Sequence, residues 1–184
     1  MKRPLFYVIG ASGAGKDSVC SGARGQMDGA LPVLFAHRYI TRPVDAGAEN
    51  HVVLSKKEFR MRRENGLFAM AWESHGNHYG IGVEIDRWLE KGFGVVVIGS
   101  RAYLERAALK YPTMVVVHVQ VCRQILMERL VQRGRENAAQ IEKRLQRSDT
   151  LAAVEYDNCH IIDNDKDLAV SVSRFITLIK SNFY

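Results

Sequence analysis

Five apolar stretches of strand length recur along the chain, and they constrain its fold more than any other feature. Most of their successive positions are apolar, whereas a strand with one wet face would alternate apolar and polar residues. Such runs are typical of strands that are covered on both faces in a parallel sheet. Helix-length segments lie between them, and this alternation predicts a three-layer α/β fold with a parallel central sheet. The predicted strands are residues 5–10, 32–37, 93–99, 113–121 and 159–163.

The segments between the strands carry helix signals of their own. Ser55 and Glu58 form a capping-box pattern at the start of segment 55–66. Gly92 has the position of a C-terminal cap for segment 82–92. Four further helices are predicted over residues 17–27, 122–134, 137–156 and 167–181.

The length of 184 residues fits one domain with a substantial core and is too short for two full-sized ones. Periodicity is weaker from residue 41 to 82, so we expect a small acceptor lobe there, inserted into a core of residues 1–40 and 83–184. No apolar run approaches the roughly 20 residues that cross a membrane, and we read the N-terminus as the first strand. The three cysteines are widely spaced, which predicts buried free thiols in a reducing cytoplasm.

The chain carries a formal net charge of +6, and many of its arginines lie between residues 123 and 147. The planar fork of arginine suits bidentate binding of phosphate. Nucleic-acid binding lacks the support of an aromatic stacking pattern or a known motif. The charge therefore favours small phosphorylated ligands and predicts neither a nucleic-acid nor a membrane partner.

The first apolar run leads directly into a glycine-rich loop that fits the pattern G-x-x-x-x-G-K. In such a loop, backbone N–H groups turn toward a phosphate, the following helix contributes its dipole, and the lysine reaches the transferring phosphate. An incidental strand-to-helix turn would explain the glycines but not a lysine at this spacing. The predicted nucleotide-binding residues are Gly10, Ala11, Ser12, Gly13, Ala14, Gly15, Lys16, Asp17 and Ser18.

Asp17 departs from the motif, which has a hydroxyl residue after the lysine. A carboxylate about 4 Å from a phosphate charge would be repelled by about 4 kcal/mol at an effective dielectric constant near 20. Two arrangements avoid this cost. In the one we favour, Asp17 binds Mg²⁺ between the two anions, directly or through water. In the other, Asp17 turns away and stabilises only the start of the helix.

The chain resembles guanylate kinases over nearly its whole length, through the segments HRYITRP, ESHGNHYG, RGRENAAQIEKRL and IIDNDKDL. The resemblance implies that Arg42 and Tyr79 bind the acceptor phosphate. It also implies an arginine lid over residues 133–144, in which Arg133 and Arg144 stabilise the transferring phosphoryl group. Phosphoryl transfer requires charge neutralisation and positioning more than covalent chemistry. A solvated helix face is the alternative reading of these arginines.

Two departures from the guanylate kinases bear on the acceptor. Met70 stands where they place a guanine-binding glutamate, and Ile81 replaces their hydroxyl residue. Guanine would then leave its N–H donors unpaired, at about 1–3 kcal/mol for each lost hydrogen bond. GMP is therefore a poor candidate for the acceptor.

The chain is also similar to the ribose 1,5-bisphosphate phosphokinases of bacterial phosphonate degradation, and the aspartate in the loop belongs to that pattern. This resemblance implies that ATP, with Mg²⁺, phosphorylates ribose 1,5-bisphosphate to 5-phosphoribosyl 1-diphosphate. The cations expected to bind this acceptor are Arg38, Arg42 and Arg101. In a further hypothesis, Glu49, Asn50 and His51 form hydrogen bonds with the ribose hydroxyls of the acceptor. The alternative is that these three residues only form a turn. The shared stretches are GASGAGKDS, AHRYITR, AGAENH, HYGIGVEID, GSR and RGREN.

Two other functions stay open at the level of sequence. A guanylate or other nucleoside monophosphate kinase would use the same loop and lid. A non-catalytic guanylate kinase-like interaction module would have lost the loop, whereas this chain keeps Gly15 and Lys16. The expected ligands are ATP and a sugar phosphate, and the chain is a monomer or a homodimer.

Overall fold

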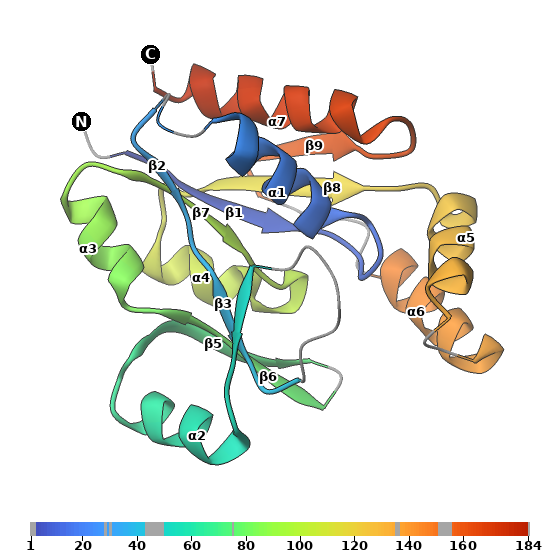
Figure 1. Ribbon diagram of the computed structural model, residues 1–184, viewed down its shortest axis with the longest axis horizontal. Helices are drawn as coiled ribbons and strands as arrows, with labels where there is room; N and C mark the ends of the chain where they lie inside the picture. The colour runs from blue at the N-terminus through green and yellow to red at the C-terminus, as the bar shows by residue number, and fades with distance from the viewer. Residues whose placement is uncertain are drawn as a thin grey trace.

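The computed structural model describes residues 3–27, 29, 31–42, 50–74, 76–134, 137–150 and 156–183. Its strands form two sheets (Figure 1). The central sheet has five strands in the order β2-β7-β1-β8-β9, and a second sheet has four strands in the order β4-β3-β6-β5.

The central sheet confirms the five predicted strands. Its members are β1 (Leu5–Ile9), β2 (Val33–Phe35), β7 (Gly94–Ile98), β8 (Val115–Gln120) and β9 (Cys159–Asp163). All of its strand pairs are parallel. Every residue of β1 and β7 is buried, as their unbroken apolar sequences predict for strands covered on both faces.

Helices cover both faces of the central sheet, which confirms the three layers (Figure 1). On one face α1 (Lys16–Gln26) and α7 (Leu168–Ser181) share an apolar cluster with the sheet. On the other face α3 (Glu84–Glu90) and α4 (Leu104–Lys110) pack in a second cluster. We did not predict α4 from the sequence.

The remaining predicted helices are present, and both expected end signals are observed: Ser55 caps α2, and Gly92, with a φ of 83°, follows α3. The Oγ of Ser55 accepts a hydrogen bond from the backbone N–H of Glu58 over 3.1 Å at the start of α2 (Lys56–Glu64). α5 (Arg123–Arg133) ends at Gly134, which has a φ of 62°. α6 is Ala138–Thr150, and residues 151–155 of the predicted segment 137–156 lie outside the described residues.

The weakly periodic segment forms the second sheet from β3 (Arg38–Ile40), β4 (His51–Val53), β5 (Phe68–Ser74) and β6 (Asn77–Gly82). β3 is parallel to β4, whereas the β3–β6 and β5–β6 pairs are antiparallel. We predicted a lobe over residues 41–82, and the sheet takes in residues from Arg38 onward. Residues 43–49, and with them Glu49, lie outside the described part of the chain.

The cysteines differ partly from the expectation of buried thiols. All three are free, but Cys20 alone is buried, Cys159 is half-buried and Cys122 is exposed. Cys122 precedes the first residue of α5, where the chain leaves the central sheet. Within the described ranges, the helices are too short or too polar to cross a membrane.

Candidate active site

The phosphate-binding loop joins β1 to α1 at the carboxyl edge of the central sheet. Gly10 has a φ of 151°, and a Cβ there would lie 2.2 Å from the carbonyl oxygen of Val119 on β8. Gly15 has a φ of 89°, and a Cβ there would lie 2.3 Å from Nδ2 of Asn164. Both positions therefore require glycine for the backbone conformation and for the close approach of neighbouring groups.

Asn164, just beyond β9, supports this loop from the sheet. Its Nδ2 donates to the carbonyl of Ala14 over 2.8 Å, and its backbone N–H donates to Gln120 over 2.8 Å. Arg129 on α5 donates through Nη2 to the carbonyl of Asn164, also over 2.8 Å. We assigned no role to Asn164 or Arg129 from the sequence. Asn164 lies in the segment IIDNDKDL, whose resemblance to guanylate kinases could have indicated a functional role for it.

Lys16 folds back over the loop that precedes it. Its Nζ donates to the carbonyl oxygens of Gly10 over 2.9 Å and Ala11 over 2.8 Å. Desolvation lowers the pKa of Lys16 to about 8, Asp17 acts in the opposite direction, and Arg38 and Arg101 lower the pKa further. The guanidinium of Arg38, from the second sheet, and that of Arg101, from the segment after β7, thus lie close enough to the ammonium of Lys16 to repel it.

Asp17 forms an ion pair with Arg38, between Oδ1 and Nη2. The side chain of Arg38 is 10% exposed and that of Asp17 is 27% exposed. The carboxylate thus lies in the first turn of α1, with a cation from β3 beside it. Ser18, the next residue, is exposed.

The proposed lid region contacts the loop through Arg144. Its Nη1 donates to Oγ of Ser12 over 2.7 Å, so α6 is connected directly to the loop. Arg123 at the start of α5 pairs with Glu142 over 2.9 Å and with Asp149, both on α6. Arg133 is exposed on the last turn of α5, and its role stays a prediction. Residues 135–136 of the predicted lid lie outside the described residues.

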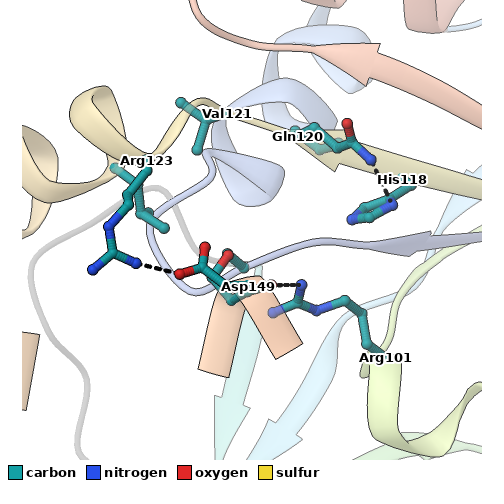
Figure 2. Close-up of a pocket in the computed structure, with 10 residues that line it drawn as sticks. Arg101, His118, Gln120, Val121, Arg123 and Asp149 are labelled. Carbon is teal, nitrogen blue, oxygen red and sulfur yellow. Dashed lines mark hydrogen bonds and ion pairs between the residues drawn. The ribbon is translucent and has the colours of Figure 1, made fainter. Parts of the chain in front are cut away.

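A pocket of about 130 Å³ lies between the loop, the end of β8 and the ends of α5 and α6 (Figure 2). Arg101 reaches across it and donates through Nη1 to the carbonyl of Ser148 over 3.2 Å. Burial lowers the pKa of Arg101, and Arg147 lowers it further. The other lining residues are Ala11, His118, Val119, Gln120, Val121, Arg123, Leu126 and Asp149.

His118 is a buried histidine of this pocket that sequence reasoning missed. Burial lowers its pKa to about 4, and the charges of Arg101 and Lys16 act in the same direction. The ring is therefore neutral at pH 7. Nε2 of Gln120 lies 3.1 Å from Nδ1 of His118. With the amide as donor, Nδ1 accepts and the ring proton lies on Nε2.

Tyr79 lies on β6, and Arg42 follows the end of the neighbouring strand β3. Ile40 pairs with Tyr79 in the register of β3 and β6, and Arg42 follows two residues later. The Tyr79 ring stacks on Trp72, with ring centres 5.7 Å apart.

The two positions that we identified as unsuited to guanine are also neighbours in this sheet. Met70 and Ile81 are register partners on β5 and β6, and they are 1% and 0% exposed. Both belong to the apolar cluster on the α3 and α4 face of the central sheet. Their side chains contribute no hydrogen-bonding group to this part of the second sheet.

Lys16, Asp17, Arg38 and Arg101 lie near one another beside the loop, with the Asp17–Arg38 ion pair among them. Ser12 and Arg144 join this group through their hydrogen bond. Converging cations of this kind can neutralise the charge of a phosphate chain and of a second phosphate beside it.

The fold is that of guanylate kinases. A guanylate kinase from Anaplasma phagocytophilum superposes with a TM-score of 0.68 at 15% identity, covering 98% of this chain and 87% of that one. A gluconokinase from Sinorhizobium meliloti superposes with a TM-score of 0.53 at 17% identity, covering 98% and 93%. These similarities confirm the predicted phosphate-binding-loop kinase fold.

No protein-family model matches the chain. The ribose 1,5-bisphosphate phosphokinase of Psychromonas ingrahamii is 47% identical to it, covering 98% of this chain and 91% of the relative. That of Desulfomicrobium baculatum is 53% identical, covering 90% and 88%. That of Thiobacillus denitrificans is 47% identical, covering 95% and 92%. Identity at this level over nearly the whole length shows that the chain belongs to the ribose 1,5-bisphosphate phosphokinase family.

Proposed function

We propose that the protein transfers the γ-phosphoryl group of ATP to the 1-phosphate of ribose 1,5-bisphosphate, giving 5-phosphoribosyl 1-diphosphate and ADP. The observation that carries the proposal is the group of cations beside the loop, Lys16, Arg38 and Arg101. In addition, the two positions that we matched to the guanine-binding residues of guanylate kinases hold Met70 and Ile81, which are apolar and buried. The names of the relatives specify the same acceptor. The reaction would belong to phosphonate degradation, and we propose the cytoplasm as its compartment.

In the proposed reaction, the loop amides and Lys16 bind the outer phosphates of ATP. An oxygen of the acceptor's 1-phosphate attacks the γ-phosphorus in line, and the bond from this phosphorus to the β–γ bridging oxygen breaks as ADP leaves. A phosphate monoester has a second pKa near 6, so the attacking oxygen is ionised at pH 7. No general base is then required, and the residues need only position and neutralise charge.

The cations divide between the two substrates by their places in the fold. Arg144, bonded to Ser12, and Arg133 would neutralise charge on the transferring group. Arg42 and Tyr79 on the second sheet, with Arg38 and Arg101, would bind the acceptor's phosphates. We therefore propose that this sheet is the acceptor lobe and that residues 133–144 form the lid.

A magnesium ion fits the oxygen donors beside the loop. Mg²⁺ prefers oxygen ligands and retains several waters, and the partly exposed carboxylate of Asp17 and the exposed hydroxyl of Ser18 are donors of this type. Asp17 is the residue that we propose to hold it. When bound, the ion supplies neutralisation of the ATP phosphates.

A parallel acceptor screen tests the proposal. ADP release is measured with ATP, Mg²⁺ and one of ribose 1,5-bisphosphate, GMP or AMP. We expect turnover with the bisphosphate and little with either nucleotide. Turnover with GMP and none with the bisphosphate would instead make the chain a guanylate kinase. Failure to bind ATP by calorimetry in the presence of Mg²⁺ would identify a non-catalytic interaction module.

A further inference from the structure

We propose that Asp17 is a positioning residue for the acceptor, whose carboxylate holds the guanidinium of Arg38 beside the phosphate-binding loop. The inference rests on the proposed function and deepens it. It gives the loop aspartate a role in binding ribose 1,5-bisphosphate, in addition to any contact with the Mg²⁺ that accompanies ATP.

The Asp17–Arg38 ion pair connects the helix that follows the loop with the second sheet. Asp17 belongs to α1, which packs on the central sheet, and Arg38 is the first residue of β3 in the second sheet. The backbone of Arg38 is fixed independently, because its N–H donates to the carbonyl of Asn50 over 3.0 Å and it pairs in register with His51. The backbone position from which the Arg38 side chain extends toward the loop is therefore set by the second sheet.

The carboxylate favours this position of the guanidinium. The side chain of Arg38 is 10% exposed, and its charge is close enough to the Lys16 ammonium to disfavour it. A buried cation beside another cation is strongly unfavourable without a partner anion. Removal of Asp17 takes one partner anion from this buried cation, so a position nearer solvent and farther from Lys16 becomes more favourable for Arg38.

An arginine held in this way can serve the acceptor phosphate. The guanidinium has five N–H donors in a planar fork, so one edge can bind a carboxylate while another binds a phosphate. Phosphoryl transfer requires the reacting atoms to approach to about 3–3.5 Å, which places the attacking phosphate next to the loop. Arg38 is a cation of the second sheet that lies beside the loop. A hydroxyl in place of Asp17 would not hold it there.

A double-mutant cycle tests the inference with Asp17→Asn, Arg38→Lys and the combined variant. Arg38→Lys keeps the positive charge but loses the planar guanidinium that can bind two partners at once. This variant therefore tests the inference even if Asp17→Asn folds poorly. The matched control is Arg87→Lys, which alters an exposed arginine that pairs with Glu90 over 3.0 Å. For each protein we measure the KM of ribose 1,5-bisphosphate, the Kd of this acceptor and of Mg²⁺-free ATP by calorimetry, the Mg²⁺ dependence and the melting temperature.

We expect each single variant to raise the acceptor's KM and Kd by about 10–100-fold, in line with the loss of other residues that orient a binding group. The double variant should be no more than about threefold worse than the worse single variant, because the two residues act as one unit. The Kd of Mg²⁺-free ATP should change little, and Arg87→Lys should match the wild type.

Three results would overturn the inference. One is an effect of Asp17→Asn that multiplies with that of Arg38→Lys. Another is a change in Mg²⁺ dependence or ATP binding with acceptor binding unaltered, which would make Asp17 a residue of the donor site only. The third is a lower melting temperature with unchanged acceptor KM and Kd. Absence of turnover in the wild type would contradict the proposed function instead, and the acceptor Kd values would still decide the role of Asp17.

Discussion

The side chain of Asn164 ties the phosphate-binding loop to the end of β9, and its truncation should loosen the loop. Asn164 is 3% exposed and donates over 2.8 Å to the carbonyl of Ala14, which is 0% exposed. In Asn164→Ala this carbonyl loses its donor, and an unsatisfied buried group costs about 1–3 kcal/mol. A chain of this size loses about 2–4 °C in melting temperature per kcal/mol. We therefore expect a fall of about 2–12 °C together with weaker binding of ATP.

Urea denaturation and calorimetric titration with ATP measure the two effects. Asn65→Ala is the matched control, because Nδ2 of Asn65 donates to the carbonyl of Met61 over the same 2.8 Å but at the surface. This variant should lose about 0.5 kcal/mol or less. A loss in Asn164→Ala as small as in Asn65→Ala, with an unchanged Kd for ATP, would refute the reasoning.

Three further predictions follow from the site. Lys16→Ala should lower turnover by about 10²–10³ or more, measured by ADP release; near-normal activity would remove Lys16 from the mechanism. Arg144→Ala should lower kcat by about 100-fold with an almost unchanged melting temperature, and an unchanged kcat would contradict the contact with Ser12 as a functional one. His118 has a pKa lowered from 6.5 to about 4, so protonation favours the unfolded state. From pH 6.5 down to 4 the wild type should lose about 3 kcal/mol of stability that His118→Asn does not lose; parallel losses in urea denaturation would refute this assignment.

The centre of the first sheet was predictable because β1 and β7 are unbroken apolar runs, which are typical of strands covered on both faces. The edge strand β9 is mostly exposed or half-buried, although its sequence also predicted a strand. The second sheet was not, since its strands mix polar, aromatic and glycine residues and two of them have only three residues. Gly80 illustrates the difficulty: a Cβ there would lie 2.7 Å from the Phe68 ring, a requirement that only the β5–β6 pairing creates. α4 was not predicted, although α3 is equally short, because α4 lacks the glycine that marks the end of α3 at Gly92.

The loop was predictable from its spacing, but the partners of its residues were not. Asp17 and Arg38 are 21 positions apart, and their pairing depends on how β3 approaches α1. Arg129 lies on a helix whose arginines we took as suited to phosphate, and only the fold directs it to Asn164. His118 was hidden within the apolar run VVVHVQ, where it read as part of a core strand. Such roles arise from tertiary contacts, which local spacing does not encode.

The most direct test of the central claim is a ³¹P NMR time course of the protein with ATP, Mg²⁺ and ribose 1,5-bisphosphate. The account predicts that the signal of the 1-phosphate disappears as a new diphosphate signal, distinct from that of ADP, grows in equal amount. Loss of the ATP γ signal to free phosphate, with the bisphosphate left intact, would contradict the account.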